Sequence, residues 1–103
     1  MKAPEECANL AEIRAEIDGI DREVIAALGE RFRYVKAAAK FKSNRGEVAA
    51  PERLMAMLEQ RRTWATKAGL HPDVVETIYR ELVSYFIAEE QREFDAARAE
   101  DSE

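Results

Sequence analysis

A largely apolar stripe that extends over about 32 residues is the feature that most constrains the fold of this chain. At about 100° per residue, one face of a helix over residues 10–42 gathers the aliphatic side chains. They are Leu10, Ile13, Ile17, Ile20, Val24, Leu28, Val35 and Ala38. Such a helix would be roughly 48 Å long, whereas a compact domain of about 100 residues has a radius of gyration near 13 Å. We therefore predict one helix that is too long for the rest of its own chain to cover.

Prolines and glycines divide the remainder of the chain into two further helices. One is expected to start at Pro51 and to end near Ala68, with Gly69 as the C′ residue that follows it. The other starts at Pro72 and runs into the nineties, before a charged tail over residues 98–103 that we expect to be frayed. The apolar stripe of this third helix comprises Val75, Ile78, Tyr79, Leu82, Tyr85 and Phe86.

The length of the chain and the uncovered stripe together predict the architecture. A chain of 103 residues allows a single domain, which we place at residues 1–103. Because two shorter helices cannot cover the long stripe, we expect a second copy of the chain to do so. The fold class is therefore all-α, with three helices, one of them very long, in an intertwined homodimeric helical bundle.

Charge and hydropathy exclude several partners and locations. The net charge of −5 argues against non-specific nucleic-acid binding, and no basic segment with interleaved aromatic residues opposes that reading. No apolar run approaches the length of a membrane span, and the first ten residues lack the apolar core of a signal peptide. We therefore expect a cytoplasmic protein without a membrane partner.

Arg31 and Lys42 point the same way as the apolar stripe, whereas the other cations of the helix lie elsewhere around it. They are separated by about 20° in rotation and roughly 16 Å in rise. A cation directed at a core is costly unless paired, which favours a buried anion from the protein or from a ligand. Alternatively, both side chains lay their methylene stems on apolar surface and extend their charged heads into water. Lys42, near the helix end, could do this most easily.

The scarcity of cysteine and histidine excludes disulfide, zinc and nucleophilic sites of the usual kinds. Cys7 is the only cysteine and His71 the only histidine, so there is no pattern for a disulfide framework, a zinc site or a relay to a nucleophile. His71 precedes Pro72 and is interpreted as a helix-start residue. Fixed cations and hydrogen-bond donors remain, which suit a small polyanion and electrostatic positioning without metal or cofactor. The polar segment 43–49 is expected to be a mobile loop that orders over this ligand.

Four segments, at residues 10–21, 27–42, 50–53 and 85–90, resemble the all-helical chorismate mutase family. Within it, the opening MetLys-x-ProGlu-x-Cys and the central AlaProGluArg are most similar to the branch typified by the isochorismate-pyruvate lyases of salicylate biosynthesis. The resemblance covers nearly the whole chain. It implies an intertwined homodimer with two equivalent active sites, a small dicarboxylate substrate, chorismate or isochorismate, and no cofactor.

The resemblance also implies roles for five residues. Arg14 would be donated to the site of the partner chain, and Arg31 and Arg53 would line the carboxylate region of the ligand. Lys42 would reach a carboxylate and the ether oxygen, which Glu90 would face from the third helix. Helix geometry agrees independently on one point: Arg14 is rotated about 100° from Arg31, as expected if the two serve different sites.

The activity that we expect from this resemblance is that of a chorismate mutase, a pericyclic rearrangement of chorismate to prephenate by electrostatic preorganisation. The first alternative is isochorismate-pyruvate lyase, which converts isochorismate to salicylate and pyruvate. In both reactions negative charge develops on the enolpyruvyl fragment and its ether oxygen, where a cation and clamped carboxylates are effective. The second alternative is a non-catalytic helical dimerisation module, in which Arg31 and Lys42 are solvated.

Several positions depart from the pattern of ordinary bacterial mutases. Ala50, Leu54 and Phe86 are apolar where those enzymes place polar or acidic groups, which favours the lyase branch and leaves the recognition of the ring hydroxyl open. Glu90 stands where they usually have glutamine, a donor at any pH, so the protonation state of Glu90 in the site is open too. The register through residues 87–90 selects Glu90 rather than neighbouring Glu89, and the alternative for either residue is a surface acid at the end of the third helix.

Overall fold

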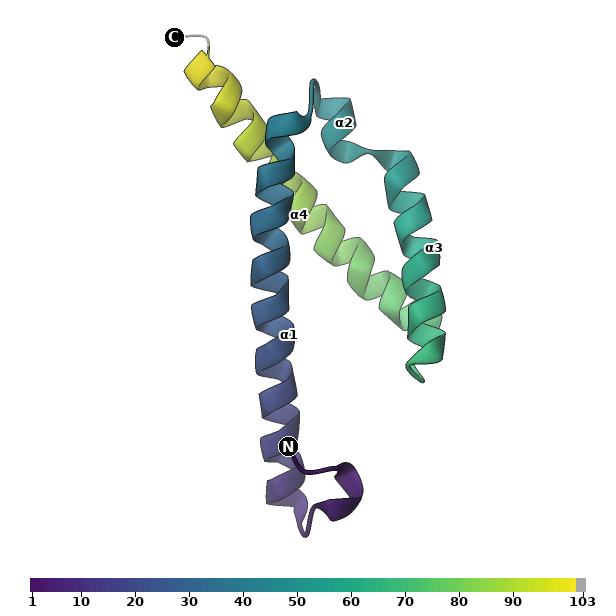
Figure 1. The fold of residues 1–103 in the computed structure, drawn as a ribbon. Helices are drawn as coiled ribbons and strands as arrows, with labels where there is room; N and C mark the ends of the chain where they lie inside the picture. The colour runs from purple at the N-terminus through teal and green to yellow at the C-terminus, as the bar shows by residue number, and fades with distance from the viewer. Residues whose placement is uncertain (102–103) are drawn as a thin grey trace. The chain divides into compact units, whose positions relative to one another are not determined.

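The structure, a computed structural model, describes residues 1–101, without the side chains of residues 49, 100 and 101, and every regular element in that range is a helix (Figure 1). The first long helix, α1, spans Leu10–Ala38 and continues as a 3₁₀ turn, η2, at Ala39–Phe41. The other two are α3, Pro51–Lys67, and α4, Pro72–Asp101. The predicted all-α class with three long helices is confirmed. None of the described helices is long and apolar enough to cross a membrane.

The helix ends follow the local signals of the sequence with one exception. Gly69, at φ +80°, follows α3, and the amide of Leu70 donates to the carbonyl of Ala65 at 2.8 Å, which is a Schellman C-cap. His71 is a helix-start residue as predicted, because its Nδ1 accepts the amide of Asp73 at 3.1 Å. The frayed tail is the exception: α4 continues to Asp101, and the last two residues of that tail lie outside the described chain.

The segment 43–49 is not an irregular loop, so that part of the prediction was wrong. It contains a short helix, α2, at Arg45–Ala49. Asn44 caps α2 by accepting the amide of Glu47 at 2.9 Å, and the Glu47 carboxylate receives the amide of Ser43 at 2.8 Å. Val48 is 2% exposed, which anchors α2 in the core. Asn44 followed three residues later by Glu47 is a capping spacing that predicts such a helix.

Ala50 separates α2 from α3 by adopting a left-handed backbone conformation. Its φ of +39° is the one positive φ of a non-glycine residue in the described part of the chain. For an L-residue this conformation costs roughly 1–2 kcal/mol, and without it the two helices would run together. Immediately after it, Pro51 occupies the first position of α3, where a missing amide proton costs nothing.

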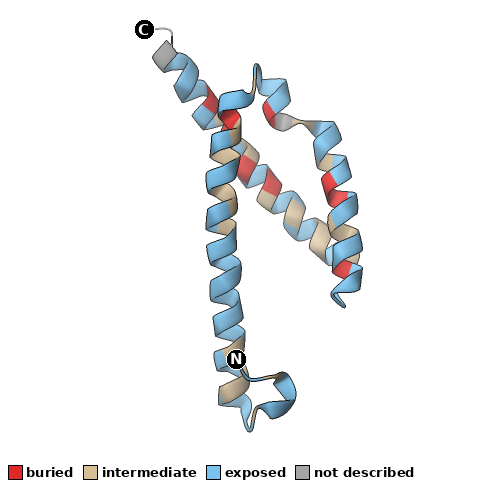
Figure 2. Ribbon diagram, viewed as in Figure 1, coloured by how far each residue is buried: buried red, intermediate tan, exposed pale blue. Residues whose placement is uncertain are grey.

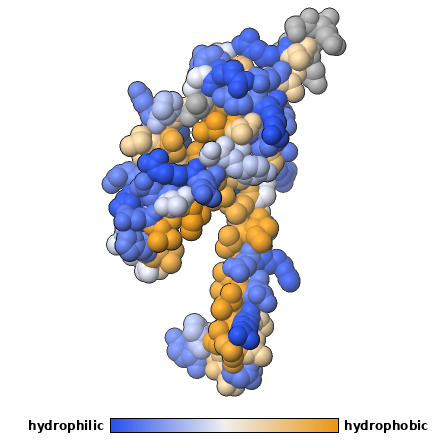
Figure 3. Space-filling view, turned by 180° about the vertical axis from the view of Figure 1, so that it is seen from behind, coloured by the Kyte–Doolittle hydropathy of each residue, from blue (hydrophilic) through white to orange (hydrophobic). Residues whose placement is uncertain are grey.

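The chain divides into two compact units, Met1–Tyr34 and Val35–Glu103, and the first of them contains little packing. A 3₁₀ turn, η1, at Pro4–Glu6 precedes α1, and Lys2 pairs with Glu12 at 3.0 Å. No residue of α1, all of which is described, is buried (Figure 2). The stripe residues Leu10, Ile17, Ile20 and Val24 are 45–59% exposed. Figure 3 shows apolar side chains gathered in a band along the lower helix.

The second unit has its own core, formed by α4 with the elements on either side of it. The first half of α4 packs antiparallel to α3, where Met57, Leu58 and Val83 are buried together. The second half packs against η2 and α2, where Ala39, Val48 and Phe94 are buried. Ile87 packs against both clusters and links them.

The buried face of α4 differs from the stripe predicted for it. Ile78 and Tyr85 are about half exposed, whereas Val83, Phe86 and Phe94 are buried. The prediction centred the stripe on the first half of the helix. The inner face is set instead by the contacts of the second half with η2 and α2, and it is therefore rotated relative to the predicted stripe.

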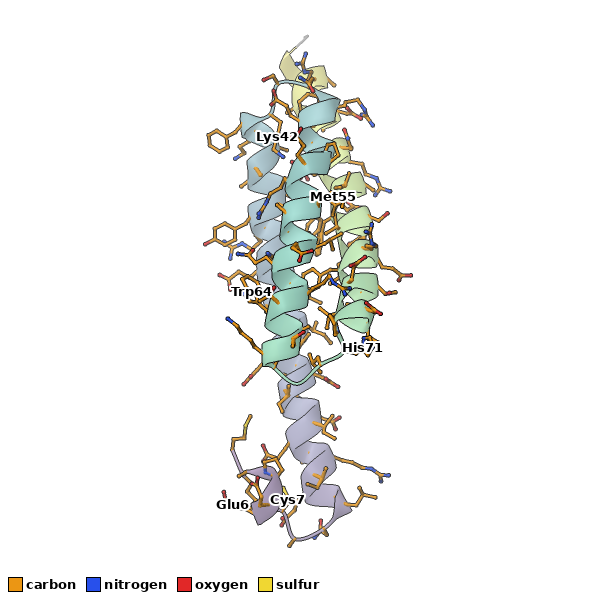
Figure 4. The ribbon with its side chains drawn as sticks, turned by 90° about the vertical axis from the view of Figure 1, so that its right-hand side faces the viewer. Glu6, Cys7, Lys42, Met55, Trp64 and His71 are labelled. Atoms are coloured by element: carbon orange, nitrogen blue, oxygen red, sulfur yellow. The ribbon has the colours of Figure 1, made fainter. Side chains whose placement is uncertain are left out.

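Two arginines of α3 lie close to the start of α4. Arg62 bridges Asp73 at 2.8 Å and Glu76 at 3.1 Å, and thereby joins the two helices at their turn. The guanidinium of Arg61 stacks over the rings of Trp64, at 4.7 Å, and Tyr79, at 5.7 Å. Trp64 and His71 mark this region of the hairpin in Figure 4.

Candidate active site

Lys42 follows the last turn of η2, where the helical path of the chain ends. Its amide donates to the carbonyl of Ala39 at 3.3 Å, and its own backbone is extended, with φ −97° and ψ 138°. The ammonium lies 2.9 Å from Oε2 of Glu90 and 3.3 Å from the carbonyl oxygen of Glu47. Lys42 is labelled in Figure 4. Its side chain is 24% exposed, so the head does not simply extend into water.

Glu90 is the one buried charged residue among the described side chains, at 5% exposure. It lies on the same face of α4 as Phe86 and Phe94, one turn before it and one turn after it. A carboxylate in such apolar surroundings is costly unless an opposite charge and hydrogen bonds compensate it. The Lys42 ammonium is that opposite charge. Lys42 is thus a partly buried cation paired with a buried anion, and the anion comes from the protein.

The electrostatics beside this pair are set by the start of α2. The carboxylate of Glu47 receives the amide of Ser43 and also its hydroxyl, at 3.1 Å. The Ser43 amide lowers the pKa of Glu47 most, the Ser43 hydroxyl and the charge of Lys42 lower it further, and desolvation opposes them. The carboxylate of Glu47 therefore accepts the hydrogen bonds of Ser43. The backbone carbonyl of Glu47 accepts the Lys42 ammonium.

The other three predicted site residues are less tightly placed. Arg53 is exposed in the first turn of α3, and no described contact joins it to Lys42 or Glu90. Arg14 and Arg31 belong to the unit Met1–Tyr34, where Arg14 is exposed and Arg31 is half-buried. The structure thus brings Lys42 and Glu90 together, and the ligand-binding roles of all five residues stay predictions.

The three apolar departures have a structural explanation in two cases. Phe86 is buried, and Leu54 packs against the cluster of Met57, Leu58 and Val83. Both side chains therefore serve the core beside the pair. Ala50 is half-buried at the left-handed junction between α2 and α3. Of these three positions, Phe86 lies one turn before Glu90 on α4 and contributes to the apolar side of the pair.

Sequence reasoning missed α2 and the backbone acceptor that it supplies to Lys42. The signal available was the capping spacing of Asn44 and Glu47. It also missed the polar side chains of α4 that contact this segment, Gln91, Asp95 and Arg98. No local pattern reveals contacts between residues about 50 positions apart. Among the described residues, no group of three or more His, Cys, Asp or Glu side chains could hold a metal ion.

Comparison with known proteins gives consistent matches. The family model for chorismate mutase type II matches residues 13–91. An isochorismate pyruvate lyase of Pseudomonas aeruginosa is 46% identical over 90 residues, which cover 87% of this chain and 89% of that protein. The T-proteins of Haemophilus influenzae and Enterobacter agglomerans are 38% and 32% identical over 84 and 77 residues. This chain spans only 22% and 21% of their respective lengths.

Proposed function

This chain belongs to the chorismate mutase type II family, and from that premise we propose that it catalyses a pericyclic reaction on the enolpyruvyl ether of chorismate or isochorismate. The observation that carries the proposal is the Lys42 ammonium, held at 2.9 Å by the buried Glu90 in apolar surroundings. A preorganised cation in a site of low polarity stabilises developing negative charge more strongly than water does.

In the proposed reaction the ether C–O bond of the substrate breaks and negative charge builds on its oxygen. Lys42 faces that oxygen and one carboxylate, while Glu90 holds the ammonium in place. Arg31 and Arg53 bind the carboxylate region, and Arg14 comes from a partner chain. Positioning a folded substrate conformer between these cations supplies the catalysis, so the proposal needs no cofactor and no protein nucleophile.

Two reactions fit this arrangement, and they differ in what happens to the enolpyruvyl fragment. In a mutase, its methylene carbon forms a new bond to the ring and gives prephenate. In a lyase, that carbon takes a hydrogen from the ring, and pyruvate leaves while the ring becomes salicylate. We propose that the protein has mutase activity. The lyase is the second candidate, favoured by the relative that this chain matches over 89% of its length and by the apolar Leu54 and Phe86.

The experiment is to incubate the purified protein separately with chorismate and with isochorismate and to identify the products. Prephenate from chorismate is expected, and salicylate with one equivalent of pyruvate from isochorismate would establish the second activity. Run in D₂O, an intramolecular hydrogen transfer leaves the methyl group of pyruvate without deuterium. If neither substrate is converted, the proposal fails and a non-catalytic dimerisation module is the reading that remains.

We also propose that the functional unit is a homodimer. The exposed aliphatic residues of α1 form a continuous face, and covering the exposed half of four such side chains would gain roughly 1 kcal/mol for each of them. A second copy of the chain is the occupant that gives Arg14 access to another site. A single folded species of monomer mass in sedimentation equilibrium, independent of protein concentration, would contradict this assembly.

A further inference from the structure

The second half of α4 carries three polar side chains that reach the segment following η2. The amide of Gln91 donates to the carbonyl of Arg45 at 3.2 Å. One guanidinium nitrogen of Arg45 lies 2.6 and 2.5 Å from the two carboxylate oxygens of Asp95. Arg98 donates to the carbonyl of Ser43 at 2.5 Å. Because residues 91, 95 and 98 are spaced as i, i+4 and i+7, they share one face of α4.

These contacts add little to stability individually, because the side chains of Arg45 and Asp95 are 59% and 55% exposed. These contacts matter because they hold the segment that adjoins Lys42. Ser43 follows Lys42 directly, and the Lys42 ammonium donates to the carbonyl of Glu47 in the same segment. Fixing the segment 43–47 therefore fixes both the backbone from which the lysine side chain departs and one of its acceptors.

The two ends of this segment are held by different means. Its last residue is anchored by the next one, Val48, which is buried with Ala39 and Phe94. Its beginning is exposed and has no apolar anchor of that kind, since Ser43 and Arg45 are both exposed. Polar contacts from α4 hold the beginning of the segment instead.

We infer that Gln91, Asp95 and Arg98 form a polar clamp that holds the segment 43–47 so that the Lys42 ammonium stays beside Glu90. They are positioning residues, since the described clamp contacts go to the segment and not to Lys42 itself. The inference rests on the proposed function, which gives Lys42 its role in the reaction.

The kinetic test compares Asp95→Asn with the matched control Asp73→Asn. Both substitutions remove one carboxylate of an exposed ion pair made by α4, but Asp73 contacts α3 near the turn. Asp95→Asn should lower kcat about 3- to 10-fold with little change in KM, because Lys42 acts on charge that develops in the transition state. Asp73→Asn should leave both constants unchanged. Exchanging the charges in Arg45→Asp/Asp95→Arg should restore most of the loss.

Two further measurements separate positioning from general structure. In a Lys42→Ala background, Asp95→Asn should have no additional effect on the residual rate, because its target is already absent. An equal loss in both backgrounds would overturn the inference. Amide hydrogen exchange over residues 43–48 should be at least several-fold faster in Asp95→Asn than in wild type or Asp73→Asn.

The exchange measurement needs no substrate, so it distinguishes failure of the clamp from failure of the proposed function. Unchanged exchange would show that no clamp exists. Faster exchange with unaltered kcat would show that the clamp does not position Lys42, and either result overturns the inference. Lack of turnover by the wild-type protein would instead overturn the proposed function, while the exchange data would still decide whether the segment is clamped.

Discussion

The two units of the chain are built on opposite principles. Val35–Glu103 buries apolar side chains from four elements in two clusters that Ile87 connects, and it encloses a paired charge, Glu90 with Lys42. Met1–Tyr34 presents a longer apolar stripe than any other segment, yet the part of α1 within it contains no buried residue. Both units carry apolar residues at helical spacing. In one unit these residues form a core, and in the other they form an exposed face. The proposed homodimer would account for this difference, because a second copy of the chain would cover the exposed stripe.

The largest expected effect is the loss of activity when a predicted site cation is removed from either unit. Arg31→Ala and Lys42→Ala should each lower kcat/KM by at least ~10²-fold, and Lys42→Ala chiefly through kcat. Lys42→Ala should also lower stability, because it leaves Glu90 buried without its partner. Steady-state kinetics normalised to folded protein provide the measurement. Exposed cations close by, in Arg33→Ala and Lys40→Ala, are the controls and should have normal rates.

The second prediction tests whether the two units of one chain serve different sites. Arg14→Ala and Lys42→Ala proteins, each nearly inactive alone, are mixed in denaturant in equal amounts and refolded together. If Arg14 acts in the partner's site, half of the dimers are mixed and one of their two sites is intact, so about a quarter of wild-type activity returns. If Arg14 acts within its own chain, every site lacks one cation and the mixture remains inactive.

The third prediction places a charge on the uncovered face. Ile20→Asp should raise the dimer dissociation constant at least about 10-fold, because an aspartate in an apolar interface loses its hydration. Its unfolding midpoint should fall, and the dependence of that midpoint on protein concentration should move to higher concentrations. Ala26→Asp introduces the same residue on the opposite side of α1 and should leave the dissociation constant unchanged. Equal effects of the two substitutions would show that the stripe is not an interface.

The fourth prediction concerns Glu90, the charged residue buried in the second unit. As the acceptor that holds Lys42, it is expected to act as a carboxylate, so Glu90→Gln should lower kcat about 5-fold by weakening that contact. The control Glu89→Gln should leave kcat unchanged, because Glu89 pairs with Arg92 within α4 and no described contact joins it to Lys42. Steady-state kcat and KM of both variants provide the measurement. A wild-type kcat in Glu90→Gln would show that the carboxylate does not hold Lys42 for the reaction.

The smallest effect is expected at the α3–α4 turn, and it depends on pH. The hydrogen bond from Arg62 lowers the pKa of Asp73. A carboxyl group with a lower pKa in the folded state adds stability above its unfolded pKa of about 3.9, and this contribution disappears as the pH falls through the folded value. Thermal unfolding of Asp73→Asn should therefore occur at a slightly lower temperature than that of wild type at pH 7, and the difference should vanish once the pH falls below the lowered pKa of Asp73. Glu81→Gln, on the exposed side of α4, is the control.

The sequence predicted those features that are determined by nearby residues. The start of α3 at Pro51, its end at Gly69 and the capping role of His71 all depend on residues within one or two turns. The cation at position 42 was recognised because its side chain interrupts a periodic stripe. Its protein partner was placed there only by resemblance, since Glu90 is 48 positions away and its burial depends on how α4 meets η2 and α2. The left-handed conformation of Ala50 was not predictable, because alanine carries no local signal for it.

The stacking of Arg61 on Trp64 has a consequence for how unfolding can be observed. Trp64 is the only tryptophan, so tryptophan fluorescence reports on the surroundings of α3 in the second unit. Far-ultraviolet circular dichroism, in contrast, detects the helical turns of both units. If the units unfold together, the two signals follow one curve at every protein concentration; if α1 loses its helix first when the protein is diluted, the dichroism transition precedes the fluorescence transition. Comparing the two signals thus distinguishes unfolding of the second unit from loss of helix elsewhere in the chain, without a label.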